Sequence, residues 1–294
     1  MENFQKKILK HKIRNLPNLP TLPANVIMTL NYLREPEVDI RKVVAAVSRD
    51  QIILAQIMKL INSGFYGLRA KVESVGHAVN LLGVNKLKEL LLTVSVMEPL
   101  AHKDPQLWFH AYSSFRLMTT LLADCPELGV AANLPLTMLM HDIGQVVLER
   151  LNPVSHRIAV ESSHANDKAL FHFEQKLLGV DHGEAGGWLM EFWEMPEDIT
   201  VPIACHHSTD IPPKFVRETV LVKIVDAIDC AVRSIPHEFP PDAWLDAAGI
   251  AEFDHEFWIG EHAQSVEKLD ASNPAIGENT QKIKRQTASA APVK

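Results

Sequence analysis

Histidine and aspartate residues recur in the second half of the chain, each among apolar neighbours. The set consists of His110, the adjacent pair His141 and Asp142, His182, the adjacent pair His206 and His207, and Asp226. Neutral imidazole and ionised carboxylate are the ligands expected for Fe, Mn, Zn or Co, whereas Ca or Mg favours oxygen ligands alone. Burying several such polar groups costs free energy, which a shared cation would offset. The set therefore points to a metal centre.

Adjacent ligands constrain the backbone that carries them. Neighbouring helical residues point about 100° apart, so His141 and Asp142 reach one ion only from a helix end or a bend. We expect Gly144 to supply that bend. The pair His206 and His207 meets the same constraint, and we expect one of the two rings to be a ligand.

Each of these residues also has an ordinary structural explanation. A single histidine on an apolar helix face is usually a core residue bonded to a carbonyl, and Asp226 alone would be a surface or cap residue. We interpret the remaining histidines as surface or cap residues: His11, His77, His102, His156, His164, His172, His237, His255 and His262. The three cysteines are widely spaced, which excludes a disulfide framework and a cysteine zinc site and indicates inert thiols.

The elements that must position these residues are helices. Apolar residues repeat with a period of 3.6, and strand-type alternation is scarce, so we predict an all-α protein. Asp39 and Ser74 are helix N-caps, and Pro105 begins a long helix that runs to Asp124. Asp181 is among the further helix boundaries.

The candidate ligands define the expected division of the chain. We predict an amino-terminal helical subdomain at residues 1–100, a subdomain with the metal site at 101–273, and a disordered tail at 274–294. The net charge of −7 argues against broad binding to nucleic acid or to an anionic membrane. No apolar run approaches the roughly 18 residues that span a bilayer, and no signal peptide is evident, so a cytoplasmic protein is expected.

At these residues the sequence resembles the HD superfamily of metal-dependent phosphohydrolases, and more closely its HDOD branch of bacterial signalling output domains. The motifs that carry the resemblance are Leu19–Pro23, Leu60–Ser63, Ser74–Gly83, Leu107–His110, His141–Gly144, Leu178–His182, Trp193–Pro196 and His206–His207. The resemblance covers roughly residues 15–235. It implies a two-part helical bundle with an HD-domain-like carboxy-terminal half and a place in bacterial signal transduction.

The resemblance also implies roles for individual residues. His110, His141, Asp142, His182, His206 and Asp226 match metal ligands of catalytic HD proteins, with His207 as an addition. One or two divalent transition-metal ions are expected, with Fe or Mn preferred to Zn. Many HDOD members have lost some of these residues and act as non-catalytic interaction modules, whereas this chain keeps them all.

Two departures weaken the case for catalysis. The related cyclic-dinucleotide hydrolases of the HD-GYP branch have Lys where this chain has Gln145, and a Gly-Tyr-Pro loop that this chain lacks. A lysine ammonium neutralises a phosphate oxygen, whereas an amide offers only dipolar hydrogen bonds.

Three functions therefore remain open. The first is a regulatory module that contacts separate signalling proteins. The second is a metal-dependent phosphohydrolase acting on a nucleotide or another phosphoester. In that enzyme Asp142 would bridge the ions and orient the nucleophile, and His207 or Gln145 would contact the leaving group. The third is a sensor that binds a nucleotide without cleaving it.

Overall fold

The structure of the protein is a computed structural model. Its described residues form helices. The described residues are 2–16, 37–48, 72–84, 105–130 and 134–272, with single positions between 28 and 91, and they contain no strand. The predicted all-α class is confirmed. The chain divides into a smaller compact unit, Asn15–Asp104, and a larger one formed by Met1–Arg14 and Pro105–Lys294. The predicted tail at 274–294 lies outside the described residues.

The described helices of the smaller unit begin at the predicted caps. Helix α3 spans Ile40–Val47, and the Asp39 carboxylate accepts a hydrogen bond from the Arg41 amide. A second helix covers residues 75–84, and the Ser74 hydroxyl accepts from the His77 amide at 3.1 Å. Both side chains satisfy amide groups that have no partner within the helix.

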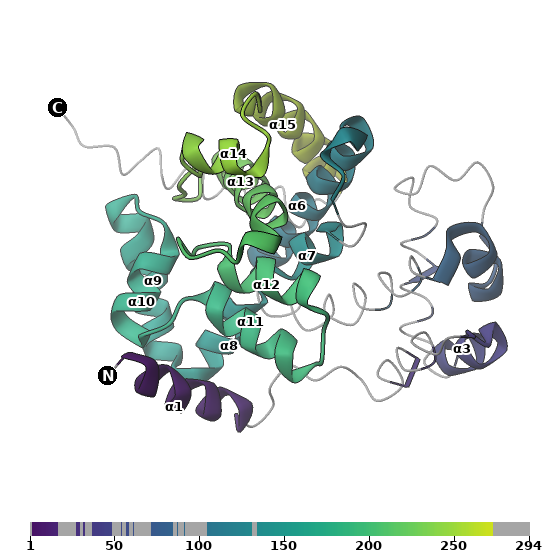
Figure 1. The fold of residues 1–294 in the computed structure, drawn as a ribbon, viewed down its shortest axis with the longest axis horizontal. Coiled ribbons are helices and arrows are strands. Elements are labelled where there is room, and N and C mark those ends of the chain that lie inside the picture. Colours follow the sequence, from purple (N-terminus) through teal and green to yellow (C-terminus); the bar gives the residue numbers. More distant parts are fainter. Residues whose placement is uncertain are drawn as a thin grey trace. The chain divides into compact units, whose positions relative to one another are not determined.

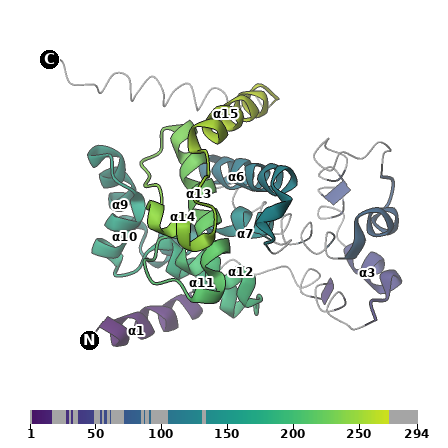
Figure 2. The ribbon, with the colours of Figure 1, turned by 45° about the horizontal axis from the view of Figure 1, so that its top comes forward.

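The larger unit is a bundle arranged around α13, which lies near its middle (Figures 1 and 2). Helix α13 contacts α6, α7, α12, α14 and α15. The α-helices of this unit after Asp104 are α6 (Pro105–Asp124), α7 (Leu134–Met140), α8 (Ile143–Leu151), α9 (Pro153–Asn166), α10 (Leu170–Leu178), α11 (His182–Phe192), α12 (Glu197–Cys205), α13 (Val216–Arg233), α14 (Asp242–Ala248) and α15 (His255–Ser272). Short 3-10 turns at Pro126–Leu128 and Pro213–Phe215 lead into the following segments.

One apolar cluster joins α13 to its neighbours. Leu221 and Ile228 of α13 are fully buried, as are Met118 of α6 and Met138 of α7, and Trp258 of α15 closes the cluster. Burial of this apolar surface fixes α13 in place. Helix α13 can therefore present polar side chains at a defined depth in the bundle.

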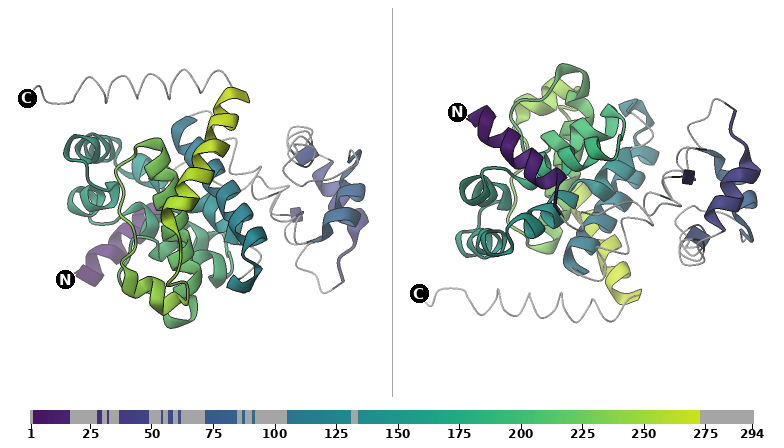
Figure 3. Two further views of the ribbon diagram at one scale, coloured as in Figure 1. Left: turned by 90° about the horizontal axis from the view of Figure 1, so that it is seen from above. Right: turned by 90° about the horizontal axis from the view of Figure 1, so that it is seen from below.

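The first helix, α1 (Glu2–Arg14), packs against α8 and α11 of the larger unit (Figure 3, right). The structure thus divides the chain differently from the expected subdomain at 1–100. Ile13 is fully buried, and Lys6 forms an ion pair with Glu184 of α11 at 2.9 Å. Lys10 pairs with Glu191 on the same helix. Two ion pairs of opposite charge and a buried apolar residue thus hold α1 on α11. Only the tertiary structure shows that these distant residues are partners.

Gly144 has a different role from the one expected. The backbone turns at His141 and Asp142, before Gly144, which lies inside α8. A Cβ atom on Gly144 would lie 1.8 Å from the carbonyl oxygen of His182 and 2.7 Å from the amide nitrogen of Gly186. Gly144 therefore allows α8 to approach α11 closely.

The close approach of α8 to α11 predicts how a larger side chain at Gly144 changes the stability of the protein. Gly144→Ala should lower the free energy of unfolding by about 3 kcal/mol or more, because backbone atoms must move to admit the methyl group. Gly260→Ala in α15 is the matched control, since nothing lies within 4 Å of its added Cβ. The control should be neutral or slightly stabilising, because alanine favours helix over glycine. Urea unfolding measures both, and equal stability of the two variants would contradict the close packing.

Candidate metal centre

The structure brings together all seven residues that the sequence singled out as ligands. They come from α6 (His110), the turn between α7 and α8 (His141 and Asp142), the start of α11 (His182), the end of α12 (His206 and His207) and the middle of α13 (Asp226). We call these seven side chains the His/Asp centre. His207 and Asp226 are half-buried and the other five are buried, so the centre has one accessible edge.

The first group of the centre gathers around His110. Its Nε2 atom lies 3.1 Å from Nε2 of His141 and 3.1 Å from Oδ1 of Asp226. Oδ2 of Asp142 is 3.5 Å away. His110, His141 and Asp142 each offer a ligand atom within 4.8 Å of the others, which is close enough to hold one metal ion.

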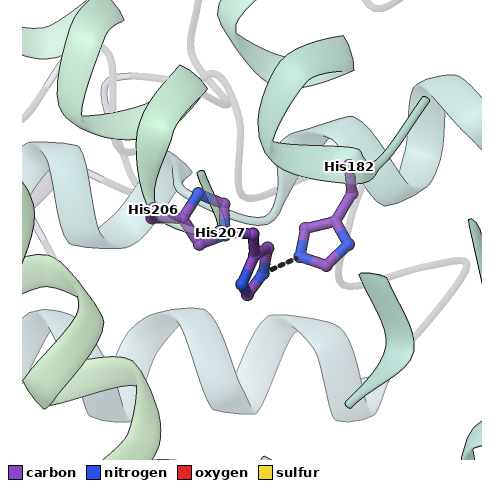
Figure 4. A group of neighbouring side chains, drawn as sticks. All are labelled: His182, His206 and His207. Atoms are coloured by element: carbon purple, nitrogen blue, oxygen red, sulfur yellow. Dashed lines mark hydrogen bonds between the residues drawn. The ribbon is translucent and has the colours of Figure 1, made fainter. Parts of the chain in front are cut away.

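The second group consists of His182, His206 and His207 (Figure 4). Nε2 of His207 lies 2.7 Å from Nε2 of His182, so both rings of the adjacent pair face this group. Oδ1 of Asp142 lies 3.1 Å from Nε2 of His182 and 3.9 Å from Nε2 of His206. The Asp142 carboxylate thus lies between the two groups.

Helix ends explain how these side chains point inward. Asp142 occupies the N-cap position of α8 but makes no capping hydrogen bond, so its carboxylate is directed to the centre. Asp181, which the sequence marked as a helix boundary, is the N-cap of α11, and its side chain accepts from the Glu184 amide at 2.9 Å. His182 and His206 therefore project from opposite ends of two packed helices, α11 and α12.

Hydrogen bonds fix the protonation of the buried rings. Nδ1 of His141 lies 2.6 Å from the Met138 carbonyl oxygen, and Nδ1 of His206 lies 2.6 Å from that of Ile203. A carbonyl oxygen only accepts, so each Nδ1 carries the proton and donates it. In the neutral rings, Nε2 then presents a lone pair to the centre. This arrangement is the one found in metal-binding histidines.

Carboxylates play the same part for the other two buried rings. Nδ1 of His110 lies 2.7 Å from Oδ2 of Asp229, and Nδ1 of His182 lies 2.5 Å from Oε2 of Glu174. Both carboxylates are fully buried. Sequence reasoning missed Asp229 and Glu174, although Asp229 follows Asp226 by one helical turn, a spacing that could have suggested it.

The facing nitrogens and carboxylates fit a metal ion. Nε2 of His206 is buried and has no hydrogen-bond partner among the described residues, which is costly unless a cation accepts its lone pair. Imidazole nitrogen with carboxylate oxygen is a donor set suited to divalent transition metals. The His/Asp clusters can therefore hold a divalent metal ion.

The charges of the centre support the same conclusion. Burial alone would raise the pKa of Asp142, but the neighbouring His141 and His182 hold it well below its usual range. Burial alone would lower the pKa of His110, but hydrogen bonds to Asp226 and Asp229 raise it to about 10. The carboxylates thus stabilise positive charge, whether ring protons or a metal ion carry it. Metal binding is then expected to release protons.

Two further polar side chains hold the centre in place. Gln145 donates to Oδ2 of Asp142 at 2.8 Å, so its amide is engaged by that carboxylate. Lys223 donates to the carbonyl oxygens of His206 at 2.7 Å and Ser208 at 3.0 Å, which fixes the turn that carries His206 and His207. Burial lowers the pKa of Lys223 to about 8. Nothing in the sequence pattern distinguished Lys223 from a solvated lysine.

Two histidines differ from their expected surface or cap role. His262 is 2% exposed, and its Nε2 lies 2.6 Å from Oδ1 of Asp229. His156 is half-buried and faces Glu174, with Nε2 3.6 Å from Oε1. Carboxylates that already serve the centre attract both rings. His102 lies outside the described residues.

Cys230 is a neighbour of the centre that the sequence treated as an inert thiol. Its Sγ atom donates to Oδ1 of Asp226 at 3.4 Å, and it forms a third candidate ligand group with His110 and Asp226. Burial raises the pKa of the thiol well above its ordinary value. A protonated thiol is a poor ligand, so Cys230 acts here as a hydrogen-bond donor to Asp226.

The HDOD domain family matches residues 19–209, which is more than half of the chain. The chain belongs to the HDOD family. A crystal structure of an HDOD domain protein of unknown function from Geobacter sulfurreducens has a TM-score of 0.70 at 23% identity, covering 90% of this chain and 97% of that one. A Shewanella amazonensis protein provisionally named a phosphohydrolase has a TM-score of 0.66 at 18% identity, covering 86% and 93%. At these identities the likeness establishes the fold and nothing about the function.

Curated relatives of this HDOD chain are longer than it is. An uncharacterised protein of Treponema pallidum (strain Nichols) is 24% identical over 229 residues, which cover 76% of this chain and 44% of the relative. YuxH of Bacillus subtilis (strain 168) is 35% identical over 66 residues, 22% of this chain and 16% of the relative. The chain thus spans less than half of either relative. No helix among the described residues is long and apolar enough to cross a membrane.

The buried Glu174 predicts how the free energy of unfolding depends on pH. Burial alone would raise its pKa, but His182 and His156 lower it from 4.5 to about 2. A lowered carboxyl pKa stabilises the folded state above the unfolded value of 4.5, and this stabilisation is lost as pH falls towards 2. Glu174→Gln should therefore cost roughly 2–3 kcal/mol at pH 7 and make the free energy of unfolding less dependent on pH between 5 and 3.

Denaturant unfolding of chelator-treated protein at several pH values measures this effect. Glu161→Gln is the control, since Glu161 is 70% exposed and lies 3.9 Å from Arg157 in a surface ion pair. An unchanged pH slope in Glu174→Gln, equal to that of the control, would contradict the assigned contact with His182.

Proposed function

We propose that this chain is an HDOD regulatory module of bacterial signal transduction with a divalent metal ion bound in its His/Asp centre. It acts through contacts with separate signalling proteins or with a small ligand. The placement within the HD superfamily is part of the same proposal. The observation that carries it is the set of Nε2 atoms directed at one another and at two carboxylates, while Nε2 of His206 has no hydrogen-bond partner in the described part of the chain.

The ligands would be the seven side chains of the His/Asp centre, with one or two ions. His110, His141 and Asp142 would hold one ion, and His182, His206 and His207 a second. Mixed nitrogen and carboxylate ligands suit Fe, Mn, Zn or Co, and the resemblance to HD proteins makes Fe or Mn our expectation for the metal. Asp226 of α13 lies beside the first group, 3.1 Å from His110. Together the two ions would join α6, α11, α12 and α13 and so stabilise the larger unit.

The basic side chains near the centre already form hydrogen bonds within the protein, which favours a regulatory module over an enzyme. Lys223 donates to two carbonyl oxygens, and Arg233 donates to Asp229 at 2.8 Å. Four residues could replace the charge of the missing lysine: Arg116, Arg150, Arg157 and Lys214. Of these, Lys214 and Arg157 are exposed and lie near Glu197 and Glu161. A phosphoester needs cationic or strongly donating groups of its own, and the hydrogen bonds of Lys223 and Arg233 are made to other protein groups.

Metal content tests the proposal directly. Protein purified without chelator should carry at least one transition-metal ion per chain by elemental analysis, and Asp142→Ala should reduce this content severalfold. Asp210→Ala, at an exposed aspartate, is the control and should keep the metal. Chelation should lower the melting temperature of the parent and of the control. Removing a metal ion present at 100 times its Kd lowers the free energy of unfolding by about 2.7 kcal/mol.

Protein without metal, whose Asp142→Ala variant melts like the parent, would contradict the metal centre. If the protein still binds a signalling protein or a nucleotide equally well after chelation, that contact lies outside the His/Asp centre.

The alternative function is a metal-dependent phosphohydrolase acting on a nucleotide or another phosphoester. It is favoured by the position of Asp142 between the two ligand groups and by the half-buried edge at His207, Asp226 and Gln145. A bound ion would polarise a phosphoryl oxygen and activate water. In this reading Asp142 would orient the nucleophile, and His207 at the edge would contact the leaving group.

A generic phosphodiester, bis(p-nitrophenyl) phosphate, separates the two functions. The module predicts no turnover above the Asp142→Ala background in protein reconstituted with Mn or Fe. Turnover that Asp142→Ala abolishes while its circular dichroism spectrum stays native would overturn the module and support the enzyme. Saturable nucleotide binding without turnover would support a sensor.

A further inference from the structure

Helix α15 buries a histidine in the middle of its apolar face. Trp258 and Val266, one turn to either side of His262, are 7% and 6% exposed, and His262 is 2% exposed. This face packs on α13. Helix α15 lies at the periphery of the larger unit, at the top of Figure 1 and nearest the viewer in the left-hand view of Figure 3. A polar ring on an apolar face needs a partner that stabilises its burial.

That partner is the carboxylate that also holds a ligand of the centre. Nε2 of His262 lies 2.6 Å from Oδ1 of Asp229, and Nδ1 of His110 lies 2.7 Å from Oδ2. An ionised carboxylate only accepts, so both rings donate to it. One carboxylate thus connects α15 to His110.

Two other donors complete the surroundings of Asp229. Arg233 donates to Oδ2 at 2.8 Å, and the Ser113 hydroxyl lies 2.5 Å from Oδ1. Oδ1 therefore has two neighbours, Ser113 and His262, and the Ser113 hydroxyl has a second acceptor, the Phe109 carbonyl oxygen at 2.7 Å. His262 is thus a donor that, together with Ser113, fixes the Oδ1 side of the carboxylate and so the plane of the carboxylate whose Oδ2 orients His110.

We propose that His262 is a positioning residue for the metal ligand His110, acting through Asp229, so that metal loading of the centre and docking of α15 stabilise each other. The proposal rests on the metal centre proposed above. Coupling between two events is reciprocal: if the docked helix strengthens metal binding, metal binding strengthens docking by the same factor. Helix α15 lies beyond residues 19–209, so this contribution comes from outside the matched HDOD segment.

Metal affinity of His262 variants tests the positioning role. The probe is Mn²⁺ or Co²⁺ added to chelator-treated full-length protein, titrated against a competing chelator. His262→Leu should weaken binding about 10- to 100-fold, the usual effect of removing an outer-shell partner. His262→Gln keeps an N–H donor and should recover most of this loss.

Val266→Ala is the matched control on the same face of α15. It weakens packing of the helix without removing a hydrogen bond, so it should lower the melting temperature and leave metal affinity within about twofold of the parent. A purely structural role of His262 would make His262→Leu behave like this control.

Amide hydrogen exchange of α15 measures the reciprocal effect. Metal should slow exchange in residues 255–272 of the parent and of His262→Gln, and should leave the rate in His262→Leu nearly unchanged. Parent protein that binds no metal would overturn the metal centre and this inference together. Parent protein that binds metal while His262→Leu binds it equally well, or shows the same metal-dependent protection, would overturn this inference alone.

Discussion

The larger unit depends on the burial of facing polar groups that need a shared cation or added protons to satisfy one another. Nδ1 of each of four buried histidines is committed to an acceptor, so the Nε2 lone pairs of the neutral rings point into a shared space with two carboxylates. Lone pairs facing lone pairs at 3.1 Å, as between His110 and His141, need a positive charge between them or a proton on one ring. The helical framework supplies the apolar burial that holds this arrangement together.

Helix ends and one central helix achieve the convergence. His182 begins α11, His206 is the C-cap that follows α12, and the turn between α7 and α8 carries His141 and Asp142. Backbone directions at these chain reversals therefore aim the side chains at one point. Helix α13 adds Asp226 on one turn and Asp229 on the next, which places a ligand and an outer-shell carboxylate on the same face. The result is an ordered set of candidate ligands, in which the four buried histidines are each held by a second hydrogen bond at Nδ1.

Sequence patterns singled out the candidate ligands, which the structure brings together, and the helix starts, because both depend on local chemistry. The caps Asp39, Ser74 and Asp181 were predictable from the short-range demand of unpaired amides. The roles of Gly144 and His262 were not, because each depends on atoms far away in the sequence, the His182 carbonyl oxygen and the Asp229 carboxylate. A local pattern cannot indicate which distant helix will approach a glycine or share a carboxylate.

The most direct test of the His/Asp centre is anomalous X-ray diffraction from crystals grown with Mn²⁺ or Fe²⁺. The account predicts an anomalous peak about 2.0–2.3 Å from Nε2 of at least two buried histidines and from a carboxylate oxygen of Asp142. A map without a peak at the centre, in which the rings pair with one another and with the carboxylates through protons alone, would contradict it.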